Sequence, residues 1–298
     1  MLAVLLALGA AIGYGCSDFA AGLAARRSSV IRVALMTEAV CVIVIGPALA
    51  FTGGGQPNIR AVAWGMASGL AGVSGALVLY LGFRHAAFSV AGPLSAVAAA
   101  GFSVLAGLLL GERPTVLALT GIGLALPAIA GVSASAGVPA GAQAPQGAGV
   151  PGDARLHRGR PPSGVGYGLV AGVCFALLFI GLKQAGSGSG LWPVFSGQAA
   201  AFLAVGGLAA FTGDLRLPEA RGGRLAAIAG LTGGPGTVLY FLAARHGLLA
   251  VAAVLASLYP AVTILLARLL VGERLTAVRL AGLSLAAASV ALIAVGGG

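Results

Sequence analysis

Two carboxylates lie inside otherwise apolar stretches of the sequence, at Asp18 and Glu38. Asp18 precedes Arg26 by eight residues and Glu38 follows Arg32 by six, so two antiparallel helices with a short connection would hold both at similar depth. Two neighbouring carboxyl groups in a low dielectric do not both ionise readily, which is what a proton-coupling site requires. The alternative is structural: Asp18 hydrogen-bonds locally, and Glu38 pairs with Arg32.

Other polar side chains could complete such a site from the second half of the chain. At a shift of 160 residues Glu38 coincides with Gln198, so both halves keep a polar residue at this point. Lys183 could line the same cavity or extend to the membrane surface. The remaining candidates for substrate contacts are Tyr259, Ser257, Ser95 and Tyr240.

Three prolines are candidate hinges. Pro93, Pro235 and Pro260 fall inside long apolar stretches and are predicted to interrupt helices there. A broken helix inside a membrane frees backbone carbonyls that can line a cavity.

The composition indicates which solvent surrounds these residues. Only 8% of the 298 residues are charged, 59% are hydrophobic and the mean hydropathy is +1.03, whereas soluble chains carry about 25% charged residues. The apolar runs are too long for the strands of a membrane barrel. The sequence therefore predicts an all-α integral membrane protein. Its net charge of +10 is expected to meet lipid headgroups at the membrane surface, not nucleic acid.

Ten apolar runs reach the length of about 20 residues that spans a bilayer. The predicted spans are 2–25, 30–52, 61–83, 88–110, 115–134, 164–184, 191–212, 223–245, 249–271 and 276–295. The stretch 135–163 contains no apolar run and is predicted to be a flexible linker.

The two groups of five spans are copies of one another. At a shift of 161 residues Arg84-His85 coincides with Arg245-His246, and Gly111-Glu112-Arg113 coincides with Gly272-Glu273-Arg274. These pairs and triplets are expected to end helices, with the glycine in the C-terminal cap. The chain is therefore predicted to comprise repeats at 1–134 and 164–298. Because five is odd, the repeats must cross the membrane in opposite senses, as in secondary transporters with a central site.

Loop charges agree with this inversion. The first loop holds three arginines where its counterpart holds one lysine, whereas the second loop holds one arginine where its counterpart holds three; the residues are Arg26, Arg27, Arg32, Lys183, Arg60, Arg216, Arg221 and Arg224. The positive-inside rule then makes the first loop, the linker and the seventh loop cytoplasmic, and leaves both termini outside.

Two segments resemble the EamA domain of the drug/metabolite transporter superfamily. Residues 257–298 and 92–133 each contain Leu-Leu-x-Gly-Glu-Arg between two small-residue helices, and Tyr14-Gly15-Cys16-Ser17-Asp18-Phe19 is similar to the segment that opens such domains. The resemblance implies ten helices and transport of small metabolites or drugs, often as efflux. It also implies cytoplasmic termini, contrary to the loop charges.

Enzyme and cofactor motifs are not found in the sequence. The Gly230–Thr237 segment lacks the lysine of a nucleotide-binding loop, and Cys16, Cys41 and Cys174 lack metal-ligand spacing. We therefore expect no catalytic residues, metal or cofactor.

The expected function is secondary active transport across the cytoplasmic membrane, as an exporter working by alternating access, with proton antiport as its coupling. An uncoupled facilitator and a non-transporting module, such as a lipid-handling or sensory protein, are the alternatives. The sequence does not distinguish a monomer from a homodimer, and it does not identify the substrate.

Overall fold

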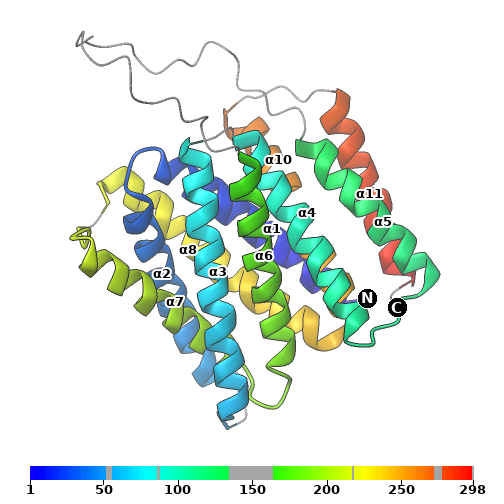
Figure 1. Ribbon diagram of the computed structural model, residues 1–298, viewed down its shortest axis with the longest axis horizontal. Helices are drawn as coiled ribbons and strands as arrows, with labels where there is room; N and C mark the ends of the chain where they lie inside the picture. Colours follow the sequence, from blue (N-terminus) through cyan, green and yellow to red (C-terminus); the bar gives the residue numbers. More distant parts are fainter. Residues whose placement is uncertain (52–55, 86–87, 134–163, 217, 272–276, 297–298) are drawn as a thin grey trace.

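The described part of the chain is helical throughout (Figure 1). The computed structural model describes residues 1–51, 56–85, 88–133, 164–216, 218–271 and 277–296, and every regular element among them is an α-helix. The helices are α1 (Leu2–Ala25), α2 (Val30–Phe51), α3 (Ile59–His85), α4 (Phe88–Leu109), α5 (Val116–Ser133), α6 (Gly164–Gln184), α7 (Trp192–Phe211), α8 (Ala220–His246), α9 (Leu249–Ala256), α10 (Tyr259–Val271) and α11 (Ala277–Gly296).

The predicted all-α membrane class is confirmed. Within the described residues, eight helical stretches are long and apolar enough to cross a membrane, one of which runs through α9 and α10. Two further apolar helices, Val116–Ile129 and Leu280–Gly296, are shorter. The linker predicted at 135–163 lies outside the described residues.

The three candidate hinge prolines differ in what they do to their helices. Pro93 and Pro235 lie inside α4 and α8, which continue through them, so the prediction that they interrupt these helices is wrong. A proline removes one backbone hydrogen bond, but packing from neighbouring helices can hold the helix together. Pro260 is the second residue of α10 and directly follows the break between α9 and α10, as predicted. Proline suits the first turn of a helix because its missing N–H has no partner there.

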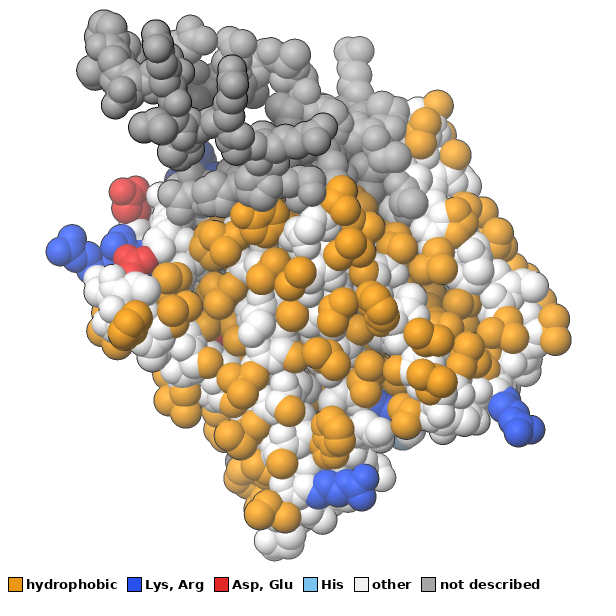
Figure 2. All heavy atoms as spheres, in the orientation of Figure 1, with side chains coloured by type: hydrophobic (Ala, Val, Ile, Leu, Met, Phe, Trp, Pro, Cys, Tyr) orange, Lys and Arg blue, Asp and Glu red, His pale blue; other side chains and the backbone are white. Residues whose placement is uncertain are grey.

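The outer surface is suited to lipid. Figure 2 shows hydrophobic side chains covering the middle of the visible face, with charged side chains gathered toward its edges. Large apolar side chains such as Phe211, Leu109 and Ile43 are 92%, 79% and 70% exposed. Exposed apolar surface on this scale would drive a soluble protein to aggregate, whereas hydrocarbon solvates it.

Packing occurs mainly between the two halves of the chain. α1 packs on α8, and its counterpart α6 packs on α3, the counterpart of α8. α2 and α7 contact each other, and so do α5 and α11, at opposite sides of the bundle (Figure 1). Exchanging the halves therefore reproduces the packing pattern.

Contacts at the helix ends define the two ends of the bundle. Ala3, in the first turn of α1, lies against Gly247, and Lys183 at the end of α6 donates a hydrogen bond to the Gly247 carbonyl. We call this end, where both termini lie (Figure 1), the terminal end. The loops after α1 and α7 meet at the other end, through a contact between Ser29 and Asp214, and we call it the Asp214 end.

Glycines let α3 and α7 approach closely. A Cβ atom added at Gly65 would lie 2.3 Å from the Pro193 carbonyl oxygen, and one added at Gly69 would lie 2.0 Å from the Gly197 carbonyl oxygen. Such spacing of small residues replaces the hydrophobic effect as the source of helix packing in a bilayer.

Gly65→Ala is expected to lower the free energy of unfolding by about 1–3 kcal/mol, because the added methyl group forces the two backbones apart. The matched control is Gly101→Ala in α4, where an added Cβ meets nothing within 4 Å. Thermal unfolding in detergent measures both. Equal melting temperatures for the two variants would show that the α3–α7 contact is not tight.

Candidate functional site

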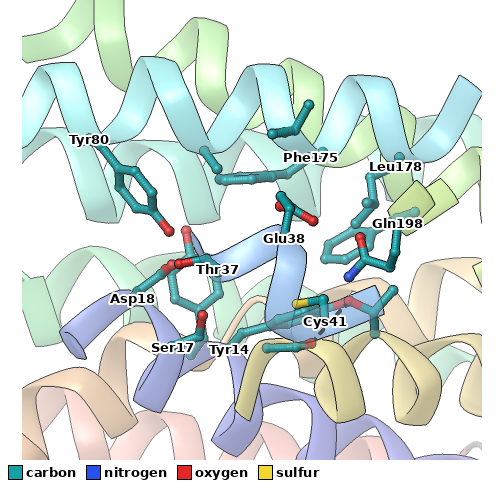
Figure 3. A pocket seen from close by; sticks show the side chains of 18 residues that line it. Tyr14, Ser17, Asp18, Thr37, Glu38, Cys41, Tyr80, Phe175, Leu178 and Gln198 are labelled. Atoms are coloured by element: carbon teal, nitrogen blue, oxygen red, sulfur yellow. Dashed lines mark hydrogen bonds between the residues drawn. The ribbon is translucent and has the colours of Figure 1, made fainter. Parts of the chain in front are cut away.

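A cavity lies among helices from both halves of the chain. It offers about 110 Å³ to water-sized molecules, and its walls come from α1, α2, α3, α6, α7, α8 and the start of α10. The two carboxylates singled out in the sequence, Asp18 and Glu38, both line it (Figure 3).

The two carboxylates lie at similar depth, as predicted. Asp18 is seven residues before the end of α1 at Ala25, and Glu38 is eight residues after the start of α2 at Val30. At 1.5 Å per residue both lie about 10–12 Å below the Asp214 end of the bundle. Among the described residues no hydrogen bond joins the two carboxyl groups, although both face one cavity.

Glu38 does not form the structural ion pair considered from the sequence. Arg32 instead donates from Nε to Asp214 Oδ1 at 2.5 Å, and Glu38 Oε2 is buried without a hydrogen-bond partner. A buried polar atom without a partner is costly and calls for an explanation, such as a proton, water or ligand. Glu38 therefore has an unmet requirement for a partner inside the cavity.

Aromatic side chains form much of the remaining wall. Tyr14, Tyr80, Tyr259, Phe175 and Phe179 line the cavity from four different helices, α1, α3, α10 and α6. The Tyr14 hydroxyl donates to Thr237 Oγ1 at 3.4 Å, and the hydroxyl groups of Ser95 and Tyr259 are 2.8 Å apart. Each of these hydrogen bonds joins one half of the chain to the other.

The structure separates the other candidate residues into two groups. Gln198 and Tyr259 line the cavity. Ser95 does not line it, but its hydroxyl is hydrogen-bonded to the hydroxyl of Tyr259. Ser257 and Tyr240 are buried but do not line it. The Ser257 hydroxyl has no hydrogen-bond partner, and Tyr240 stacks on Phe179 with ring centroids 4.3 Å apart.

Lys183 lies outside the cavity, at the terminal end. Its Nζ donates to the carbonyl oxygens of Ala244 and Gly247 at 2.7 and 2.6 Å. A cation at these last carbonyls of α8 is favoured by the helix dipole. Lys183 therefore stabilises a helix end instead of facing the cavity.

Several cavity residues could not be singled out from the sequence alone. Tyr80, Thr37 and Cys41 line the cavity, but an aromatic, a hydroxyl or a thiol in an apolar run is equally compatible with packing. The signal that could have identified such residues is their helical spacing relative to the two carboxyl residues. Thr37 and Cys41 flank Glu38 on one face of α2, and Tyr14 lies four residues before Asp18 on α1.

A second polar cluster joins the halves at the terminal end. Gly111 ends α4 with φ of +86°, as predicted for a helix C-terminal cap. The following Glu112 accepts hydrogen bonds from the backbone N–H groups of Leu249 and Ala250 at 2.6 and 3.0 Å, and Lys183 Nζ is 3.9 Å from its carboxylate. Glu112 thus caps the N-terminus of α9. The counterpart Gly272-Glu273-Arg274 lies outside the described residues.

Glu112→Ala is expected to lower the free energy of unfolding by about 0.5–2 kcal/mol, the usual cost of losing a helix N-cap. Glu219→Ala is the control, because Glu219 is exposed and its side chain makes no capping hydrogen bond. Chemical unfolding followed by helix circular dichroism reports both values. A loss no larger than that of the control would contradict the capping role.

Another polar cluster joins the two halves at the Asp214 end of the bundle. Ser29 Oγ and Arg32 Nε, from the first half, donate to the two carboxylate oxygens of Asp214 in the second half. The hydrogen bond from Ser29, with the nearby Arg32 charge, lowers the pKa of Asp214 below its ordinary value. The contact is therefore fully present above the ordinary aspartate pKa and is lost only as the pH falls through the lowered value. Changes of pH near neutrality leave it intact.

A bundle of membrane-length helices around a central cavity with ionisable residues is the architecture of a membrane transporter. The profile of the EamA-like transporter family matches residues 1–134 and 162–295. The chain belongs to this family, and the two matched segments correspond to the two copies found in the sequence. The family is one of transporters, not of enzymes.

Comparison with solved structures agrees on the fold. A structure described as "Crystal structure of protein" aligns over 98% of this chain and 97% of that chain, with a TM-score of 0.71 and 16% sequence identity. At this identity the likeness establishes the fold alone. No curated protein matches the chain.

Proposed function

We propose that the protein is a secondary active transporter of the cytoplasmic membrane that exports a small molecule in exchange for protons. Ten helices in two inverted repeats, 1–134 and 164–298, would carry this out by alternating access. The single observation that carries the proposal is the buried Oε2 oxygen of Glu38, which has no hydrogen-bond partner, in a residue that lines the same cavity as Asp18 between the two halves.

Inversion is supported by the helix ends. The first turn of α1 contacts Gly247, and Gly247 also accepts a hydrogen bond from Lys183 at the end of α6. α1 therefore begins at the end of the bundle where its counterpart α6 finishes. Two copies that run in opposite senses give the protein two related conformations, one open to each side of the membrane.

Alternating access is supported by the two polar clusters. Ser29 and Arg32 bind Asp214 at one end, whereas Glu112 binds the N-terminus of α9 at the other. Each cluster joins the first repeat to the second. Opening one end while the other stays closed requires one cluster to break at a time, and charge-assisted hydrogen bonds of this kind can break and re-form between two states.

Orientation is proposed from the loop charges. The Asp214 end carries most of the described arginines that flank spans, and the positive-inside rule makes this the cytoplasmic side. These arginines are Arg26, Arg27, Arg32, Arg216, Arg221 and Arg224.

Proton coupling is supported by the chemistry of the cavity. The titratable groups that face it are Asp18 and Tyr14 from α1, Glu38 and Cys41 from α2, Tyr80 from α3 and Tyr259 from α10. The carboxyls are the members of this set that give up a proton most readily, because phenols and thiols ordinarily ionise at higher pH. The sequence contains no nucleotide-binding loop, so any uphill transport would draw on an ion gradient.

Metabolite profiling tests the function. Cells lacking the gene should accumulate a compound that cells overproducing the protein release, and everted membrane vesicles should take up that compound when a pH gradient is imposed. An ionophore that collapses the gradient should stop accumulation. Uptake that persists after the collapse would indicate an uncoupled facilitator, and identical metabolite profiles with no vesicle uptake would contradict transport.

A further inference from the structure

The cavity has two carboxyl groups and, among its described lining residues, no compensating cation. Asp18 and Glu38 line it, and its described lining includes no lysine, arginine or histidine. Two basic side chains near lining residues in the sequence are engaged elsewhere: Arg32, six residues before Glu38, binds Asp214, and Lys183, four residues after Phe179, binds the end of α8. A carboxylate in such a place requires a proton or a cation from outside the protein.

Aromatic rings surround these carboxylates. Tyr14, Tyr80 and Tyr259 line the same cavity as Asp18 and Glu38. In Figure 3, Tyr80, Thr37 and Asp18 gather on one side of Glu38, and Gln198 and Leu178 on the other. Aromatic faces attract cations and are a recurrent means of binding quaternary ammonium groups.

The same walls are poorly suited to other ligands. An anion would meet two carboxylates with no cation to bind it. A hard metal ion such as Ca²⁺ takes six to eight oxygen ligands, whereas much of this wall consists of phenyl rings, glycines and aliphatic side chains. The volume of about 110 Å³ is of the same order as the ~150 Å³ cavity that holds benzene in another protein, so a small organic ion fits.

We infer that the cavity binds a small organic cation, an amine or quaternary ammonium compound, and that this cation replaces the proton held by Glu38. The inference rests on the proposed function, because it names the substrate class of the same site. One positive charge enters as one proton leaves, so the carboxylate carries either ligand but not both. That competition supplies the exchange that proton antiport requires.

Isothermal titration calorimetry on the full chain in detergent tests the inference. The probes are choline and phenyltrimethylammonium, and 3,3-dimethylbutan-1-ol serves as the uncharged isostere of choline. Choline is expected to bind at least about tenfold more tightly than the isostere, since a desolvated cation–aromatic contact is worth enough for that ratio. Repeating the titration in buffers of different ionisation enthalpy should reveal the release of about one proton per cation bound.

Two variants test whether choline binding and proton release depend on Glu38. Glu38→Gln should weaken choline binding by about tenfold or more and remove the proton release, because the amide keeps the shape and loses the charge. Glu219→Gln makes the same change at an exposed site and should leave both values unchanged.

The outcomes separate this inference from the transport proposal. Failure of both ammonium probes to bind the wild-type protein, or equal binding of choline and its isostere, overturns the cation inference. If a non-cationic compound is then taken up by vesicles in response to a pH gradient, transport stands and the substrate class is wrong. If vesicle uptake also fails, both proposals fall.

Discussion

Glu38→Gln is expected to reduce transport driven by a pH gradient to the rate of protein-free liposomes. Glutamine has the size and shape of glutamate, but it cannot bind and release a proton in the cavity. Proteoliposomes containing the exported compound identified by metabolite profiling give the measurement, with a pH gradient imposed in each direction. Asp18→Asn is expected to reduce the same rate less, because Glu38 is the carboxyl with a buried oxygen that lacks a partner.

The control for this experiment is Glu219→Gln, at an exposed position at the start of α8. It should transport at the wild-type rate. Melting temperatures and elution profiles in detergent should be the same for all three variants, so that a loss of rate reports chemistry and not misfolding. Full gradient-driven transport by Glu38→Gln would rule out Glu38 as the coupling group.

A disulfide between positions 29 and 214 is expected to stop transport completely. Ser29 and Asp214 are hydrogen-bonded across the two halves at the Asp214 end, so we expect cysteines at these positions to be close enough for a mild oxidant to cross-link them. The cross-link would hold this end closed, and a transporter that must open both ends in turn cannot complete a cycle. Reduction with dithiothreitol should restore the rate of the unoxidised double variant.

The single variants Ser29→Cys and Asp214→Cys, treated with the same oxidant, control for losses unrelated to the cross-link. The wild-type chain is a further control, because it contains Cys16, Cys41 and Cys174. Undiminished transport by a fully cross-linked double variant would mean that the Asp214 end does not open during transport.

Much of the fold could be predicted because the amino-acid composition indicates that lipid surrounds the protein. Long apolar runs with few charges are expected to face hydrocarbon. Among the described residues, eight of the ten expected spans correspond to helical stretches long and apolar enough to cross a membrane, and the spans expected at 115–134 and 276–295 correspond to shorter apolar helices. The break before Pro260 was also predictable from the sequence. Pro93 and Pro235 were not interpretable in the same way, because neighbouring helices decide whether a helix bends or breaks at a proline.

The candidate site was predictable where its residues are chemically conspicuous. Asp18 and Glu38 stand out because a carboxyl in an apolar run has few structural explanations. Tyr80 does not stand out, because a tyrosine near a helix end suits a membrane interface as well as a cavity. The contact between Arg32 and Asp214 joins residues 182 positions apart, and the role of Lys183 depends on the carbonyls of another helix. Only the folded arrangement provides such partners.

The central claim is that one cavity becomes accessible from each side of the membrane in turn. The most direct measurement uses Ala76→Cys, in the wall of the cavity, with the three native cysteines replaced by alanine. A membrane-impermeant methanethiosulfonate carrying a trimethylammonium group is applied to one face or the other of oriented vesicles. Ala125→Cys, in the buried core away from the cavity, is the control and should react from neither face.

Alternating access predicts that the thiol at position 76 reacts from both faces and that an imposed pH gradient shifts the ratio of the two rates. Reaction from one face only, under every gradient, would contradict the claim and leave a cavity that binds its ligand without carrying it across.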